Sequence, residues 1–238
     1  MTPPANTARY KNHRFPGDII SHGVWLYYRF TLSYRDVQDL LFERGITVSH
    51  EAVRQWCRKF GQDYANRLRR RRPQPGDKWY LDKVFLTING KRHYLWRAVD
   101  QDDNVLDILV QSRRNKQAAK KFFRKLLKGC QYVPRVIITD KLKSHSAAKR
   151  EILPGMEHRQ SRYLKNRCEN SHRPTRQWEH RMQGFKSPGH AQRFLSAYGP
   201  ITQHFRPRRH LFSASDYRQE MRKRFESWAE ITGTQRAA

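Results

Sequence analysis

The chain of 238 residues is long enough to bury a core, and its 49 Lys and Arg against 21 Asp and Glu give a formal net charge of +28. Solubility needs far less charge, so we expect a polyanionic partner. Double-stranded DNA fits best, because basic side chains that neutralise phosphates release condensed counterions. No run of 18 apolar residues and no signal-peptide pattern is present, which argues against a membrane and for a cytoplasmic protein.

The first part of the chain is predicted to form three short helices after an arm. Residues 1–14 combine proline, polar residues and scattered positive charge without periodicity, which predicts a loose basic arm. From residue 15 to 66 apolar positions recur at helical spacing, and Gly45 is suited to end the second helix in a left-handed conformation. Each helix begins near a residue whose side chain can cap it: Asp18, Ser33 with Asp36, and Ser49. This order predicts a helix-turn-helix DNA-binding domain.

The third of these helices has the features of a helix that reads DNA. Val53, Trp56 and Phe60 share an apolar face, which any small helical module would need. The polar face is more informative, because residues near the start of a recognition helix contact base edges in the major groove. We therefore expect DNA contacts from His50, Glu51, Arg54, Gln55 and Arg58. Arg54 is the strongest single candidate.

A basic linker is predicted at residues 67–77. Its arginines precede a Pro-Gln-Pro-Gly run, a composition that disfavours both core and continued helix. A run of this kind is either a solvated linker or a set of phosphate contacts, and its charge density favours the contacts. The residues concerned are Arg69, Arg70, Arg71 and Arg72.

Residues 78–200 are predicted to form an α/β domain. The expected elements are strands at 79–87, 93–99 and 104–111, a helix at 115–128 and a strand at 135–139. Asn89-Gly90 is a two-residue hairpin turn, Gly129 is expected to end the helix, and the last strand runs into Asp140. This order is that of an RNase H-like mixed sheet: antiparallel strands, then a crossover helix, then a further buried strand.

The rest of the chain is predicted to be mostly helical. Helical patterns prevail from 141 to 199, with breaks at the Pro-Gly pairs that begin at Pro154 and Pro188. Residues 201–238 are expected to form a basic C-terminal tail whose helix begins at Ser215.

Three acids stand out by their position. Asp82 lies inside the first strand, a costly place for a lone charge, and Asp140 ends the buried strand. Glu169 lies in a polar, basic stretch and is uninformative by itself, and Asp140 has the alternative role of a helix cap. A cluster of such carboxylates can hold two Mg²⁺ ions, or Mn²⁺, for phosphoryl transfer. Asp100 is assigned instead to the turn after the second strand.

Several motifs in consistent order resemble the insertion-sequence transposases of family six. They are Trp79-Tyr-Leu-Asp82, Tyr94-Leu-Trp-Arg-Ala-Val-Asp100, Ile138-Thr-Asp-Lys141, Glu157-His-Arg-Gln160 and Asn166-Arg-Cys-Glu169. The resemblance runs from about residue 14 to beyond residue 190 and implies a bacterial DDE transposase with Asp82, Asp140 and Glu169 as metal ligands. It also implies that Arg176, seven residues after the glutamate, is a basic partner of the site.

The reaction that the resemblance implies begins with nicking at the terminal inverted repeats of the element, which frees 3′-hydroxyls. These hydroxyls then attack target DNA. Because two ends must be brought together, a homodimer or a larger assembly on DNA is expected.

Two features depart from the family pattern. Lys83 follows the first aspartate where the family commonly has Glu, and a cation beside a metal ligand repels the metal. Because neighbouring side chains of a strand point to opposite faces, we expect Lys83 to face away from the site. The spacing of 29 positions from Asp140 to Glu169 is shorter than in many members. The alternatives are a DNA-binding regulator that does not cleave, and a nuclease that nicks but does not join.

Overall fold

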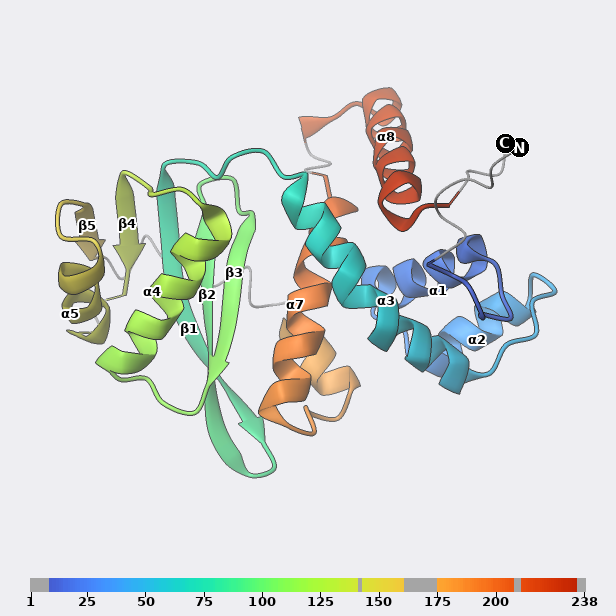
Figure 1. Cartoon of the computed structure of the whole chain (residues 1–238), viewed down its shortest axis with the longest axis horizontal. Helices are drawn as coiled ribbons and strands as arrows, with labels where there is room; N and C mark the ends of the chain where they lie inside the picture. Colours follow the sequence, from blue (N-terminus) through green and yellow to red (C-terminus); the bar gives the residue numbers. More distant parts are fainter. Residues whose placement is uncertain (1–8, 141–142, 161–174, 208–210, 235–238) are drawn as a thin grey trace. The chain divides into compact units, whose positions relative to one another are not determined.

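The computed structural model describes residues 9–140, 143–160, 175–207 and 211–234, and the chain divides into two compact units (Figure 1). One unit consists of Met1–Arg71 together with Ala197–Ala238, and the other of Arg72–Ser196. The C-terminal residues, expected as a separate tail, thus belong to the same unit as the helix-turn-helix region.

The helices of the first unit begin mostly at the capping residues that the sequence indicates. They are α1 (Gly17–Phe30), α2 (Tyr34–Phe42), α3 (His50–Arg70) and α8 (Ala214–Thr232). Ser33 and Asp36 form a reciprocal capping box, Ser49 accepts from the Ala52 amide, and Gly45 has a φ of 75°. These predictions are confirmed.

Three predicted boundaries in this unit are wrong. Helix α1 begins directly after Pro16 without a side-chain cap, and Asp18 lies within its first turn. Helix α3 continues to Arg70, so the first four residues of the expected linker are helical. The extension is stabilised by burial of Leu68 and by a 3.2 Å ion pair between Asp63 and Arg67 one turn apart. Helix α8 is capped by Ser213, two residues before the predicted start.

Part of the expected N-terminal arm is held in place by α8. The Arg9 guanidinium donates to the carbonyls of Ile231 and Thr232 at 2.8 and 2.9 Å, and the Tyr10 hydroxyl donates to the Thr232 carbonyl at 2.8 Å. These are the last carbonyls of α8, which have no partner within the helix. Residues 9–14 are therefore not a loose arm.

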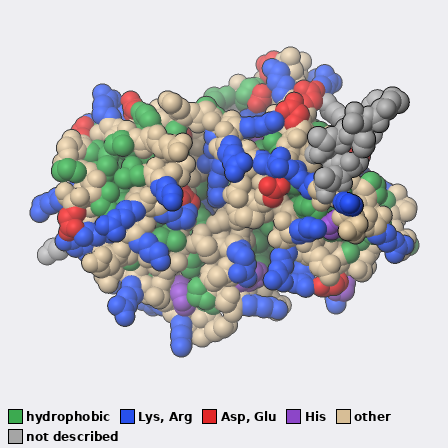
Figure 2. All heavy atoms as spheres, viewed as in Figure 1, with side chains coloured by type: hydrophobic (Ala, Val, Ile, Leu, Met, Phe, Trp, Pro, Cys, Tyr) green, Lys and Arg blue, Asp and Glu red, His purple; other side chains and the backbone are tan. Residues whose placement is uncertain are grey.

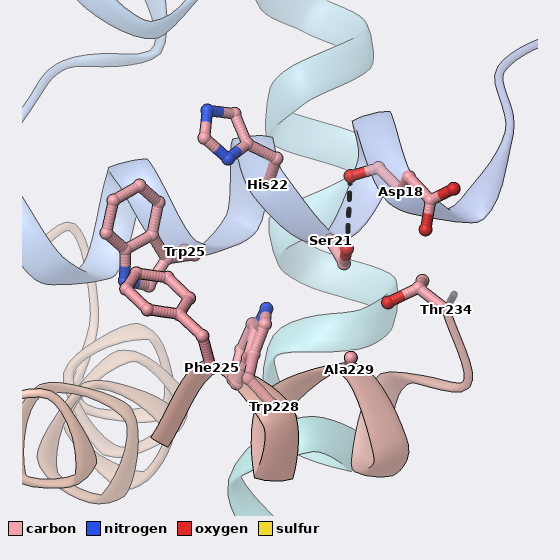
Figure 3. A pocket seen from close by; sticks show the side chains of 8 residues that line it. All are labelled: Asp18, Ser21, His22, Trp25, Phe225, Trp228, Ala229 and Thr234. Carbon is pink, nitrogen blue, oxygen red and sulfur yellow. Dashed lines mark hydrogen bonds between the residues drawn. The ribbon is translucent and has the colours of Figure 1, made fainter. Parts of the chain in front are cut away.

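Aromatic side chains join α8 to the other helices of this unit. The Trp228 ring packs edge-on against Tyr64 of α3, with centroids 5.2 Å apart. Trp25 of α1 packs edge-on against Phe225 of α8, with ring centroids 5.2 Å apart, and both rings line a pocket of about 280 Å³ together with Trp228 (Figure 3). The Thr202 hydroxyl also donates to the Tyr28 carbonyl at 2.9 Å. Burial of these large rings explains why the C-terminal residues join this unit.

The second unit contains a five-stranded mixed sheet of the RNase H-like kind. Its elements are β1 (Lys78–Ile88), β2 (Lys91–Asp100), β3 (Val105–Gln111), α4 (Lys116–Cys130), β4 (Val136–Thr139), α5 (Lys143–Ile152) and β5 (Glu157–Gln160). The strand order is β3-β2-β1-β4-β5, with antiparallel pairing from β3 to β1 and parallel pairing from β1 to β5. This confirms the predicted fold class. Helix α7 (Pro188–His204) follows in the chain.

The sheet and α4 enclose an apolar core, and Figure 1 shows α4 lying across one face of the sheet. Trp79, Leu81 and Trp96 from the strands meet Phe122 and Phe123 of the helix, all with at most 1% of their surface exposed. The hairpin turn has positive φ at both Asn89 and Gly90, as its sequence predicts.

Two predictions for this unit are wrong. Helix α4 does not end at Gly129 but continues to Cys130, and Gln131 takes the left-handed conformation instead, with φ 49°. Strand β5 lies in a segment expected to be mostly helical. It is a short strand at the edge of the sheet, its four residues are all polar, and only its pairing with β4 makes it a strand. Among the described residues, no helix has both the length and the apolar character needed to cross a bilayer.

Candidate active site

Two of the three predicted carboxylates lie on neighbouring parallel strands. The register of β1 and β4 pairs Leu81 with Thr139, so Asp82 and Asp140 are the next residues along the two strands. Asp82 is only 7% exposed, and the Asp140 side chain is 23% exposed. Hydrogen bonding between parallel strands thus brings together two acids that are 58 positions apart in the sequence.

Lys83 contacts one of these acids, contrary to the expectation that it faces away. Its ammonium lies 2.8 Å from an Asp140 oxygen, and only 7% of the Lys83 side chain is exposed. The ammonium is also 6.0 Å from the centre of the Trp96 ring, on the sheet face that α4 covers. Side chains alternate between the two faces of the sheet along β1, so Lys83 and Asp82 point to opposite faces. Asp140, however, follows the last residue of β4, so its side chain need not follow the alternation of that strand. The expectation was wrong for this reason.

Arg97 is a further residue of this region that the sequence analysis did not single out. It lies directly opposite Asp82 in the β1–β2 register and is 5% exposed. Its guanidinium donates to the Thr175 hydroxyl at 2.6 Å. A charged side chain in the middle of the apolar Tyr94-Leu-Trp-Arg-Ala-Val motif was the available signal, because a buried charge requires a partner.

The remaining predicted site residues are placed only in part. Glu169 lies outside the described residues. Arg176 is exposed, in the helical segment 175–181 and next to the Thr175 that Arg97 contacts. In the same segment, burial raises the pKa of Glu179, and nearby Arg176 opposes that rise. Within the ranges that the structure describes, no group of three or more His, Cys, Asp or Glu side chains forms a metal site.

Asp100 has the turn role that the sequence predicts. One carboxylate oxygen accepts from the amides of Asp102 and Asn104, at 2.8 and 2.9 Å, and the other accepts from the Asn104 side chain at 2.9 Å. These bonds close the turn between β2 and β3.

The predicted recognition helix presents its polar face to solvent. His50, Arg54, Gln55 and Arg58 are exposed, whereas Val53, Trp56 and Phe60 are buried. Arg54 is held by Glu51 through two hydrogen bonds, at 2.7 and 2.6 Å. The hydrogen bond from Arg54 is also the main reason why the pKa of Glu51 falls to about 2.

The four predicted linker arginines have different surroundings. Arg71 forms a 2.6 Å ion pair with Glu230, and Arg72 donates to the Val105 carbonyl at 2.6 Å. Arg69 is 3.4 Å from the Asn66 side-chain oxygen, and Arg70 is exposed. Arg71 and Arg72 thus have structural contacts of their own.

Comparison with known proteins identifies the family. Residues 76–208 match the DDE domain of the IS240 type of transposase. Over 173 residues the chain is 33% identical to the transposase for the insertion sequence-like element IS431mec of Staphylococcus aureus, covering 71% of this chain and 76% of that protein. It is 32% identical over the same length to the transposase for IS257 in transposon Tn4003 from the same species. This chain belongs to the DDE transposases of family six.

The transposase is thus an enzyme of DNA transposition, as its motifs indicate.

Among solved structures, the catalytic core domain of BIV integrase aligns with 64% of this chain and 99% of its own length, at 11% identity and a TM-score of 0.40. The catalytic core domain of HTLV-2 integrase, solved with magnesium, aligns with 57% of this chain and 88% of its own, at 12% identity and a TM-score of 0.37.

Proposed function

We propose that this transposase binds the terminal inverted repeats of its element, nicks each end to free a 3′-hydroxyl, and joins that hydroxyl to target DNA. The observation that supports this chemistry most is the position of Asp82 and Asp140 at one level of two neighbouring parallel strands. Glu169 is proposed as the third carboxylate and Arg176 as the basic partner.

The donor set fits a hard divalent cation. Carboxylate oxygens are the ligands that Mg²⁺ and Mn²⁺ prefer, and a carboxylate buried as deeply as Asp82 requires positive charge nearby. Two such ions, when bound, would activate the attacking oxygen and stabilise the leaving oxygen. The chain itself holds Asp82 in a hydrogen-bonded strand, and Arg97 ties β2 to the segment that bears Arg176.

Recognition of the element ends is assigned to α3. Ser49 caps its first turn, and the Gln38 side chain of α2 accepts from the His50 amide at 2.7 Å, which fixes α2 against the start of α3. This leaves His50, Arg54, Gln55 and Arg58 exposed for base edges and phosphates. Glu51 is proposed to orient Arg54 before DNA binds.

Sequence-independent DNA binding is assigned in part to α4. No acidic residue occurs between Asp107 and Asp140, whereas that segment has nine Lys and Arg. Lys121, Arg124 and Lys128 are exposed on α4 at helical spacing. Figure 2 shows that Lys and Arg greatly outnumber Asp and Glu on the face in view. Phosphate contacts along such a surface would strengthen binding to any duplex.

The test is cleavage of a supercoiled plasmid that carries this reading frame with its native flanks, with Mg²⁺ or with chelator. We expect metal-dependent 3′-hydroxyl ends that map to the flanks, and their loss in Asp140→Asn with DNA binding retained. Asp103→Asn is the matched control, because it removes an exposed turn carboxylate at φ 61°, a conformation that Asn tolerates. Unchanged cleavage in Asp140→Asn would refute the site assignment.

The contact between Lys83 and Asp140 favours one alternative, a copy of the transposase that binds DNA without cutting it. Sequence-selective binding without cleavage in the plasmid assay would support this alternative. Nicking without joined products would support a nuclease. The proposed assembly is a homodimer or larger on paired ends, and light scattering of the complex with end DNA measures its size.

A further inference from the structure

Among the described residues, two basic side chains lie close to Asp82 and Asp140. Lys83 contacts Asp140 at 2.8 Å on one side, and Arg97 lies opposite Asp82 on the neighbouring strand. All four side chains are largely buried, and Asp140 is the most exposed of them at 23%. In the part of the chain that the structure describes, each of the two carboxylates therefore has a basic side chain of the protein itself beside it.

The two cations differ in how easily they can move. Arg97 is anchored in the middle of β2 and held by its bond to Thr175. Lys83 has a flexible four-carbon stem and a single ammonium, and Asp140 lies past the end of β4. A buried ammonium is costly unless a carboxylate accompanies it, so Lys83 is expected to stay on Asp140 until another cation replaces it.

We propose that Lys83 is a built-in counter-ion of Asp140 that a divalent cation must displace in order to bind. This proposal rests on the proposed role of Asp140 as a metal ligand. The Lys83 ammonium contacts a carboxylate oxygen that would otherwise be free to coordinate the metal. It also repels the positive charge of a metal ion at short range. Lys83 therefore lowers the affinity of the site for divalent cations and stabilises the metal-free protein.

The test is Mn²⁺ binding to the full chain, measured from the electron paramagnetic resonance signal of free Mn²⁺. Lys83→Met should bind Mn²⁺ at least about tenfold more tightly than wild type, because one full positive charge leaves the site. Lys91→Met is the matched control, since Lys91 is exposed at the hairpin and its loss should leave the affinity unchanged. Equal affinities in wild type and Lys83→Met would overturn the proposal, and so would weaker binding in Lys83→Met.

Thermal unfolding gives a second, independent readout. In the presence of a chelator, Lys83→Met should unfold at a lower temperature than wild type. Addition of Mn²⁺ should raise the unfolding temperature of the variant more than that of wild type. If Lys83→Met does not fold, Lys83→Gln removes the charge and keeps a hydrogen-bond donor, with the same expected direction in both measurements.

Asp140→Asn separates this proposal from the proposed function. If Asp140→Asn leaves Mn²⁺ binding unchanged, Asp140 is not a ligand and both proposals fail. If Asp140→Asn weakens binding but Lys83→Met does not strengthen it, only the counter-ion proposal fails.

Discussion

Replacing Glu51 by Gln should strengthen binding of the transposase to DNA of any sequence. In the protein without DNA, both oxygens of the Glu51 carboxylate accept from Arg54, at 2.6 and 2.7 Å. The positive charge of Arg54 is thereby neutralised on the face that is predicted to meet DNA. Glu51→Gln keeps the size of the side chain and removes the negative charge, so Arg54 becomes available to a phosphate.

Lowering the pH is a poor way to break this pair. The pKa of Glu51 is lowered from 4.5 to about 2, so the stabilisation by the ion pair is present above pH 4.5 and is lost as the pH falls toward 2. At neutral pH the pair is intact. Only DNA or a substitution then releases Arg54.

The expected magnitude follows from counterion release. One added phosphate contact steepens the slope of log affinity against log salt by roughly 0.9. Between 50 and 200 mM salt this corresponds to about a threefold greater loss of affinity in Glu51→Gln than in wild type. Fluorescence anisotropy of a labelled duplex without element ends measures both slopes.

The control is Glu43→Gln, which changes the net charge equally at an exposed position whose nearest basic group, on Arg44, is 3.8 Å away. An unchanged slope in Glu51→Gln would refute the reasoning. An equal change in both variants would assign the effect to net charge and not to the release of Arg54.

Four further predictions concern recognition, phosphate binding and stability. Arg54→Ala should weaken binding to the element ends by about 1–3 kcal/mol and binding to random duplex by less, as competition assays with both DNAs would reveal. Lys121→Gln with Arg124→Gln should reduce the salt slope by up to about 1.8 on any duplex, and an unchanged slope would exclude this face of α4 from phosphate contact. Ser33→Ala should lower the free energy of unfolding by about 1 kcal/mol, because the capping box of α2 is lost. Phe122→Ala should lower it by about 3–5 kcal/mol in urea titrations, because the side chain is 1% exposed in the core under α4.

Local patterns in the sequence were sufficient for much of the fold. The capping box at Ser33, the left-handed Gly45 and the Asn89-Gly90 turn were predictable because each depends on interactions within a few residues. The order of three strands, a helix and a buried strand likewise indicated the RNase H-like sheet. The candidate carboxylates were singled out by a different route, since Asp82 interrupts an apolar strand and the surrounding motifs resemble a known family.

Sequence alone determined the kind and order of the elements from α1 to β4, and the family, because those depend on local periodicity, turn chemistry and shared motifs. The tertiary structure decided which distant groups meet. It gave β5 its strand conformation through pairing with β4, joined α8 to the N-terminal helices through large aromatic rings, and placed Lys83 on Asp140. Those contacts depend on long-range packing and on the reach of a flexible side chain past a strand end, and neither leaves a pattern in the neighbouring residues.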